Sequence, residues 1–405
     1  MGADVVEGVL DEAKDLLSGA VALRRDLHRN PELGLDLPRT QEAILGALEG
    51  LPLVIHKGSS TTSVVAVLDG GAPGRTVLLR GDMDALPMPE DTGLDYASSV
   101  EGAMHACGHD AHVSMLAGAA RLLSGRRSEI AGRVVFMFQP GEEGHHGARL
   151  MLDDGLLDQA AAGAQPVSAA FALHITTTFP SGGIFTKGGA LLASADNVRI
   201  TVRGRGGHAS MPHHAVDPIP IACEIVTALQ SLVTRRVDAF DPAVVTIARI
   251  QAGTTSNVIP ESAELYGTIR TVSHRTRREV TDAIRRLADG IAAAHGAEAE
   301  VELEEGYPVT INDDDMASFA HTVAGELLGE DAAVRMPAPV MGAEDWSYVL
   351  QEVPGAMAFL GARPDVSGPV HPNHSNRMIL DEQAMAAGIA VYSGVALRWL
   401  GSPEG

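Results

Sequence analysis

The sequence predicts an α/β protein in which a mixed, largely parallel sheet with helices on both faces is interrupted by an inserted ferredoxin-like α+β domain. Up to about residue 193, short β-branched runs alternate with helical segments, which is typical of parallel sheets. From 194 to 306 the order is strand, helix, strand, strand, helix, strand, which is the split βαβ arrangement. After 307 the first pattern returns. We therefore expect domain segments at 1–193, 194–306 and 307–405, of which the first and third form one domain.

The elements follow from apolar spacing and from the turn residues at their ends. Two helices are expected within 22–34 and 38–51, the second beginning near Thr40 and ending near Gly50. The rest of the outer domain is predicted, in chain order, as strands at 62–70 and 74–87, a helix at 111–125, a strand at 133–140, a helix at 147–157, a strand at 168–175, a helix at 316–329, a strand at 356–362 and a helix at 381–401. The insert is predicted to have strands at 197–204, 242–253, 262–273 and 299–308, and helices at 217–236 and 275–296.

Composition excludes several classes of function. The chain has 405 residues, with 30 Lys+Arg against 52 Asp+Glu and a formal net charge of −22. Such an acidic chain repels the phosphate backbone of nucleic acids. The longest apolar runs are shorter than the about 18 residues that a membrane span needs, and the acidic N-terminal stretch does not resemble a signal peptide. We therefore expect a soluble cytoplasmic protein that binds neither nucleic acid nor membrane.

The two cysteines are too few for a disulfide framework and lie in different surroundings. Cys223 is in an apolar helical stretch and is predicted to be a small buried hydrophobe. Cys107 belongs instead to the polar segment MHACGHDAH, two residues before His109.

Further metal-ligating residues follow the predicted strands. Asp82 and Asp84 come after one strand, Glu142 and Glu143 after the next, and His174 ends a third, while the late segment HPNHS adds His371 and His374. Since ligands in open parallel sheets bind beyond the carboxyl ends of strands, these groups can converge. Each fragment also has an ordinary explanation: a buried thiol beside a helix-start histidine, a solvated glutamate pair, or aspartates that cap the next segment. Their recurrence at one strand end after another favours a site for zinc, manganese, cobalt or nickel.

The adjacent glutamates have a chemical reason to be adjacent. One carboxylate can hold a metal ion while its neighbour takes a proton from an activated water and delivers it to a leaving amine. Two ions about 3.5–4 Å apart need a shared ligand, and a thiolate such as that of Cys107 has spare lone pairs for bridging.

These motifs resemble the aminoacylase/carboxypeptidase-G superfamily of dinuclear metal amidohydrolases. The resemblance covers nearly the whole chain and is strongest to hippurate hydrolases, N-acyl-amino-acid amidohydrolases and auxin-conjugate hydrolases. Its motifs are LRRDLHRNPELG, RGDMDALPMPE, MHACGHDAHVSMLAGAA, FQPGEEG, LHI, GRGGHASMPHHAVDPI, AGTTSNVIP, GTIRT and GAEDWSYVL. RGDMDALP and ACGHDAH mark this branch, because other members have His-x-Asp and an aspartate bridge.

The resemblance implies a phosphorylase/hydrolase-like catalytic domain and the role of each site residue. Two divalent ions (Mn, Zn, Co or Ni) would be bound by Cys107, His109, Glu143, His174 and His374. We choose His374 as the last ligand because of its spacing to the closing helix, with His371 as the alternative. Glu142 would be the general base and acid, and Asp84 would orient a ligand from behind.

The inserted domain resembles the family's lid and dimerisation domain, which implies a homodimer or a tetramer. In GRGGHAS, His208 would polarise the scissile carbonyl, often in the partner's site. Asn257 and Arg270 are candidates to hold the substrate carboxylate or carbonyl, although either can instead satisfy strand-end backbone groups.

Three other histidines lie close to the candidate ligands. His145 and His146 stand where many relatives carry smaller residues; they can narrow the pocket or offer a further metal site, and a surface position at a helix start is expected. His112 is expected to lie behind the ligands or in the core.

The predicted activity is hydrolysis of the amide bond of a small N-acyl amino acid, giving a carboxylate and a free amino acid. The alternatives are an N-acetyl-diaminopimelate deacetylase or dipeptidase of the same superfamily, and a catalytically silent metal-binding protein. With aromatic residues at 4%, the sequence leaves open whether the acyl group is aromatic.

Overall fold

The computed structural model describes residues 4–401, which divide into two compact units. Unit 1 takes the residues up to Gly189, Ile311–Ala338 and those from Tyr348 onward, and unit 2 takes Ala190–Thr310 and Pro339–Ser347. The segment Pro339–Ser347 differs from the sequence expectation, which placed it in the outer domain. It belongs to unit 2 because Val340 exchanges backbone hydrogen bonds with Leu191 and Ala193, a pairing that no sequence pattern marks.

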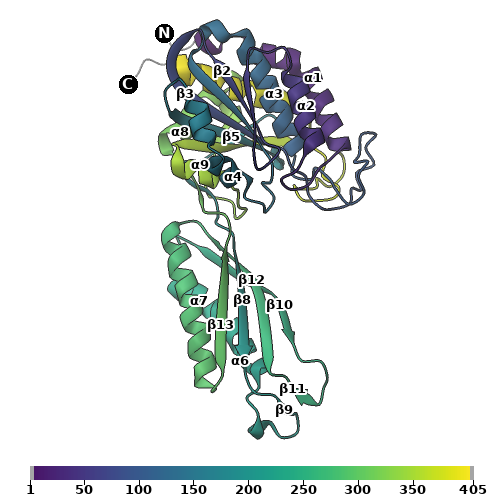
Figure 1. Cartoon of the computed structure of the whole chain (residues 1–405), viewed down its shortest axis with the longest axis vertical. Coiled ribbons are helices and arrows are strands. Elements are labelled where there is room, and N and C mark those ends of the chain that lie inside the picture. The colour runs from purple at the N-terminus through teal and green to yellow at the C-terminus, as the bar shows by residue number, and fades with distance from the viewer. Residues whose placement is uncertain (1–3, 402–405) are drawn as a thin grey trace. The chain divides into compact units, whose positions relative to one another are not determined.

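Unit 1 is built on an eight-stranded mixed sheet in the order β1-β2-β4-β3-β5-β16-β6-β15 (Figure 1). Its strands are β1 (Val54–Lys57), β2 (Val64–Asp69), β3 (Ala72–Asp82), β4 (Ala131–Gln139), β5 (Val167–Pro180), β6 (Ile184–Thr186), β15 (Ala333–Arg335) and β16 (Gly355–Arg363). The four central strands β4, β3, β5 and β16 pair in parallel, whereas β1 and β2 are joined antiparallel. The carboxyl ends of the central strands therefore lie at one edge of the sheet.

Helices cover this sheet, in agreement with the predicted α/β class. They are α1 (Val9–Arg29), α2 (Pro38–Leu48), α3 (His109–Gly125), α4 (Gly147–Asp153), α5 (Leu156–Ala161), α8 (Asp314–Leu328), α9 (Ser347–Glu352) and α10 (Ala384–Gly401), with short 3-10 turns η1 (Asp4–Val6), η2 (Arg127–Glu129) and η4 (Glu330–Ala332). One apolar core joins α1, α3, α8 and α10 to the sheet face that carries Val134, Phe136 and Phe138. The intervening residues of β4 are also buried, as expected for a central parallel strand.

Helix α10 is long and apolar enough, by length and composition alone, to cross a membrane. A search for uninterrupted apolar runs in the sequence does not find this helix, because Gly388, Ser393 and Gly394 interrupt its apolar residues. In the structure 83% of the helix is buried, with Tyr392 and Leu397 fully enclosed. Its apolar surface therefore packs against the protein core.

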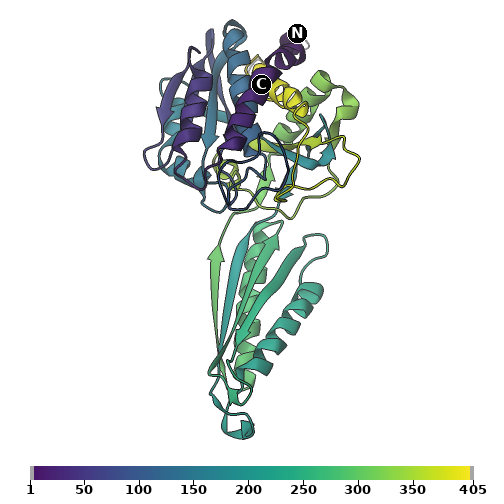
Figure 2. The same cartoon turned by 90° about the vertical axis from the view of Figure 1, so that its right-hand side faces the viewer.

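Unit 2 has the ferredoxin-like order of strands, and Figure 2 shows its long strands beside helices. Its antiparallel sheet runs β10-β12-β8-β13, formed by β8 (Asp196–Arg203), β10 (Ala243–Ala252), β12 (Ser262–Thr271) and β13 (Glu298–Glu305), with helices α6 (Pro218–Arg236) and α7 (His274–Ala294). Smaller elements are β9 (Gly207–His208), β11 (Val258–Ile259) and η3 (Pro212–His214), while β7 (Gly189–Leu192) and β14 (Thr310–Asn312) lie where the chain passes between the units.

The core of unit 2 follows from two periodicities. Val198, Ile200 and Val202 alternate along β8, and α7 contributes a stripe at every fourth residue that includes Val280 and Ile284. The prediction that Cys223 is buried is wrong: it is exposed, because the buried stripe of α6 runs through other positions, namely Ile221, Ala222, Ile225 and Leu229.

A buried network of charged side chains lies against the start of α3. Arg24, 1% exposed, contacts Asp110 at 2.8 Å and Glu382 at 3.0 Å, and donates a hydrogen bond to the hydroxyl of Tyr96. His28 donates a hydrogen bond to Asp110 at 2.7 Å. Burial alone would raise the pKa of Asp110, but Arg24 and His28 outweigh it and hold that pKa well below its usual range. Asp110 is therefore an anion whose charge is balanced inside the protein.

Candidate metal centre

The turn into α3 brings Cys107 and His109 to the same side of the helix start. Gly108 between them has a φ of 89°, and a Cβ there would lie 2.4 Å from the side chain of Ile175. Only glycine fits this turn. In the sequence CGH, the backbone therefore requires Gly108, and the metal-binding chemistry requires the cysteine and the histidine on either side of it. Cys107 is 6% exposed and His109 is fully buried.

Two imidazoles are held in the tautomer that a metal ligand needs. Nδ1 of His109 lies 2.9 Å from the backbone oxygen of Asp84, and Nδ1 of His174 lies 2.9 Å from that of Ile175. A carbonyl only accepts, so each Nδ1 carries a proton and donates it. This leaves Nε2 of each ring as the coordinating atom, a common arrangement around metal-bound histidines.

Asp84 fixes the loop that carries the two glutamates. Its carboxylate accepts hydrogen bonds from the backbone N–H of Glu142 at 3.0 Å and of Glu143 at 2.9 Å. The aspartate thus orients both the glutamate loop and, through its own carbonyl, His109. Asp84 thus lies behind the candidate ligands, and its role in orienting them stays a prediction.

His374, rather than His371, reaches the cluster. Its Nε2 lies 3.3 Å from Sγ of Cys107 and 3.3 Å from Oε1 of Glu143. The loop residue His371 contributes a backbone carbonyl, which accepts a hydrogen bond from Thr177. Between the two histidines, Asn373 donates to the carbonyls of Cys107 and Ile175, a supporting role that the sequence analysis missed although the residue lies inside HPNHS.

The charged side chains of the cluster shift one another's pKa values. Burial raises the pKa of the Cys107 thiol, but His174 and His109 outweigh it and hold that pKa well below its usual range. The hydrogen bond to Cys107 and the nearby carboxylate of Glu143 raise the pKa of His374 to about 10. Burial lowers the pKa of His109, but Asp82 and Cys107 outweigh it and raise that pKa well above its ordinary value. A cation entering the cluster therefore meets a thiolate and displaces protons from imidazoles.

The donor set fits divalent metal ions. Three overlapping groups have ligand atoms within 4.8 Å of one another: Cys107, His109 and His174; Cys107, Glu143 and His374; and His109, Glu142 and Glu143. Within the part of the chain that the structure describes, Nε2 of His109 and Oε1 of Glu143 are buried and have no hydrogen-bond partner. Two such atoms aimed into a cluster of a thiolate and imidazoles are what a bound cation would satisfy. Cys107, His109 and Glu143 each belong to two of these three groups, so the groups share ligand atoms, which suits a pair of ions.

Asp82 and His112 form a layer behind these ligands. The backbone N–H of Ile175 donates to Nε2 of His112 at 2.7 Å, so Nδ1 of His112 carries the proton and donates to Asp82. Asp82 also pairs with Arg80 at 2.8 Å, and its Oδ2 lies 3.3 Å from Nε2 of His109. His112 is therefore buried behind the candidate ligands, as expected. Asp82 contacts Arg80, His109 and His112, so its role is not limited to capping the next segment.

The remaining predicted site residues lie in unit 2. His208 on β9 and Asn257 beside β11 are adjacent, since Val258 pairs with His208 and the N–H of Ala209 donates to the carbonyl of Asn257. Arg270 lies near the far end of β12, eight residues beyond Ser262, or about 27 Å along a strand. The structure brings His208 and Asn257 together but does not bring Arg270 to them within one chain.

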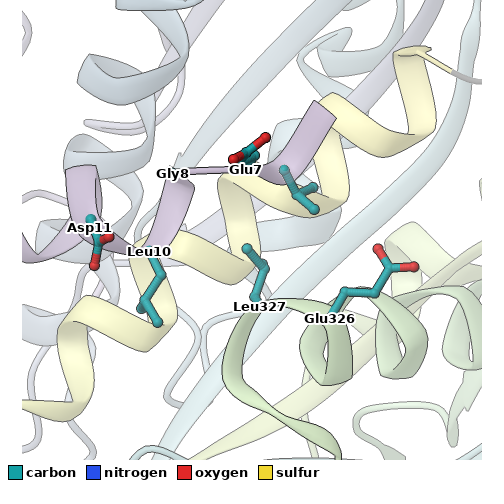
Figure 3. A pocket seen from close by; sticks show the side chains of 7 residues that line it. Glu7, Gly8, Leu10, Asp11, Glu326 and Leu327 are labelled. Atoms are coloured by element: carbon teal, nitrogen blue, oxygen red, sulfur yellow. The ribbon is translucent and has the colours of Figure 1, made fainter. Parts of the chain in front are cut away.

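A separate hollow of about 560 Å³ lies between the start of α1 and the end of α8 (Figure 3). Carboxylates of Glu7, Asp11 and Glu326 line it beside Leu10 and Leu327, and Glu326 pairs with Arg398 at 2.9 Å. The lining includes none of the predicted site residues, so the hollow is not part of the metal centre.

Comparison with known proteins gives one consistent result. A sequence model described as peptidase family M20/M25/M40 matches residues 78–398. Thermostable carboxypeptidase 2 of Saccharolobus solfataricus is 36% identical over 400 residues, covering 98% of this chain and 99% of the relative. N-acetylcysteine deacetylase of Bacillus subtilis is 38% identical over 378 residues, covering 93% and 96%. A solved Bacillus subtilis structure, described as a dinuclear metal binding peptidase from the M20 family, superposes with a TM-score of 0.82 at 35% identity and covers 96% of this chain and 99% of that one.

Proposed function

The chain belongs to peptidase family M20/M25/M40 and is a metal-dependent amidohydrolase, and we propose that it hydrolyses the amide bond of N-acyl amino acids to a carboxylate and a free amino acid. The observation that carries this proposal is the arrangement of Glu142 and Glu143. Asp84 holds their backbone amides, and both carboxylates lie in one group with His109. One glutamate can bind metal while the other moves a proton.

In this proposal Cys107, His109, Glu143, His174 and His374 would hold two divalent ions. Ions held there supply Lewis-acid activation of water and of the scissile carbonyl. Glu142, only 6% exposed, takes a proton from the attacking water and passes it to the departing amine. Manganese, zinc, cobalt and nickel all suit a donor set of thiolate, imidazole and carboxylate.

Arg270 and Asn257 of unit 2 are proposed to contact the substrate. His208 of the same unit is proposed to stabilise the oxyanion. Arg270 is half-buried and, among residues 4–401, its guanidinium has no hydrogen bond or ion pair. This argues against its satisfying strand-end carbonyls and favours its receiving the substrate carboxylate, which Arg binds bidentately. Asn257, whose side-chain oxygen accepts from Thr255, is proposed to bind the substrate carbonyl.

The substrate class is tested directly by amino-acid release. The protein is stripped with a chelator and assayed by ninhydrin with hippurate, N-acetylmethionine and an indole-acetyl amino acid, before and after addition of manganese, zinc, cobalt or nickel. We expect at least a hundredfold loss on chelation and recovery with at least one metal, because proton transfer and carbonyl activation both depend on the ions.

The alternatives give different results in the same assay. Release only from N-acetyl-diaminopimelate or from dipeptides would assign the chain to the deacetylase or dipeptidase class. Stoichiometric metal binding with no release from any of these compounds would indicate a catalytically silent metal-binding protein. The proposed setting is the cytoplasm, where the thiol of Cys107 stays reduced.

We further propose that the protein is a homodimer, or a tetramer made of two such dimers, in which unit 2 of one subunit supplies His208 to the site of the other. Within one chain, His208 and Arg270 lie near opposite ends of the unit 2 sheet, so they are too far apart to contact the same small substrate molecule. Strand β10 ends the sheet with an unpaired edge and exposes Val244 and Ile250, which suits pairing with a second copy.

Mixing two inactive variants tests this assignment. Glu142→Gln and His208→Ala are each expected to be inactive alone. If His208 acts in trans, co-expressed hybrids would contain one intact site, giving about a quarter of wild-type activity for random pairing. Activity that stays at the level of the single variants, or a sedimentation profile showing only monomer, would rule out action in trans.

A further inference from the structure

The loop between β4 and α4, which carries Glu142 and Glu143, takes an unusual path. Three of its residues have positive φ angles, namely Gly141 at 71°, Gly144 at 84° and His146 at 57°. Glycine adopts this region freely, whereas a residue with a Cβ does so at a cost. Over residues 4–401, the only non-glycine residues with positive φ are His146 and the cluster residue His374. Backbone strain of this kind is concentrated at functional sites.

A side-chain hydrogen bond holds His146 in place. Its Nδ1 lies 2.9 Å from the hydroxyl of Tyr348 on α9, and the two ring centroids are 5.9 Å apart. His146 is also the residue before α4, where its carbonyl accepts the first helical hydrogen bond from Leu150. It is therefore fixed both by the helix and by a partner distant in sequence.

The glutamates lie between two anchors. On one side Asp84 accepts the backbone N–H groups of Glu142 and Glu143. On the other side the chain returns on itself, because the N–H of Gly147 donates to the carbonyl of Gly141 at 3.0 Å. A Cβ at Gly147 would lie 1.6 Å from the oxygen of Pro140, so this closure is tight. A shift of His146 would thus be transmitted directly to the glutamates.

We propose that His146 and Tyr348 are positioning residues for the reaction: their hydrogen bond fixes the second end of the glutamate loop and so sets the position of the Glu142 carboxylate. This rests on the proposed role of Glu142. The strained backbone at His146 is the reason that a plain helix-capping role does not suffice, because glycine would cap α4 without strain.

The test separates positioning from stability. In His146→Gly the φ of 57° becomes free of strain, so the melting temperature is expected to stay the same or rise. If His146 positions the loop, kcat nevertheless falls about ten- to a hundredfold while KM and bound metal stay within twofold of wild type. Tyr348→Phe, which leaves the backbone unchanged, is expected to show the same loss, and the double variant no further loss.

The control is His145→Gly, which removes the exposed neighbouring imidazole and is expected to leave kcat unchanged. Hydrogen exchange of the 140–147 segment, measured without substrate, gives a readout that does not depend on turnover. We expect faster exchange in His146→Gly and in Tyr348→Phe than in wild type, with His145→Gly unchanged. If Tyr348→Phe shows the hydrogen exchange and kcat of wild type, the positioning role is overturned. If the wild-type protein hydrolyses no amide, the proposed function is refuted, and the hydrogen-exchange result alone then decides whether His146 and Tyr348 fix the loop.

Discussion

Glu142→Gln is expected to lower kcat by about 10²–10⁴-fold, the usual contribution of a positioned general acid–base group. Glutamine keeps the size of the side chain and the backbone N–H that Asp84 holds, but it cannot accept and return a proton. Metal content should remain that of wild type, because the proposed ligand is the neighbouring Glu143. Steady-state kinetics with the best substrate, together with metal analysis of the purified variant, measures both quantities.

Two companion variants make this result specific. Glu143→Gln is expected to lose bound metal as well as activity, whereas Glu101→Gln removes an exposed carboxylate and should change neither. Near-normal turnover of Glu142→Gln with metal bound would show that another group moves the proton.

Arg24→Met is expected to lower the free energy of unfolding of unit 1 by about 3–5 kcal/mol, the range found when one partner of a buried ion pair is removed. The guanidinium is the main cation facing Asp110 and also contacts Glu382, so its loss leaves negative charge inside the protein. Urea unfolding followed by circular dichroism measures the effect.

The matched control is Arg377→Met. Arg377 also pairs with a carboxylate, Asp91 at 2.6 Å, but both side chains are more than half exposed. Exposed pairs contribute about 0–1 kcal/mol, so this variant should unfold close to wild type. Equal effects of the two substitutions would mean that the buried network does not stabilise unit 1 in the way described.

The fold could be predicted where a periodic pattern is long enough to show. The strands and helices of unit 2 alternate with clear periods, and the continuous apolar run of β4 marks it as a central strand. The three-residue strands β6 and β15 are too short to have a detectable period, and their pairing with each other depends on distant contacts. The inclusion of Pro339–Ser347 in unit 2 depends on the same kind of contact.

The meeting of the candidate ligands could be predicted in part, because Glu143 and His174 lie just after or on central parallel strands whose carboxyl ends share one edge of the sheet. Cys107, His109, Glu143, His174 and His374 meet in the structure as expected. Apart from the contacts of Asp84, what holds them could not be predicted, because it consists of pairings across long sequence separations. Arg24 and Glu382 are 358 positions apart, and His146 and Tyr348 are 202 apart. The choice of His374 over His371 is likewise fixed by a loop conformation, with φ of 69° at His374.

The position of α10 in the core has a consequence for the order of folding during translation. Its residues Ala384–Gly401 pack against β3, β4, β5 and β16, yet they leave the ribosome only after the whole of Ala190–Thr310. Most of the inserted unit is one continuous stretch and can fold as it emerges, whereas the part of the larger sheet that α10 covers stays uncovered until much later. The nascent chain therefore exposes that part of the sheet's apolar face for the time needed to add about 200 residues, and we expect chaperones that shield apolar surfaces to bind it during this time.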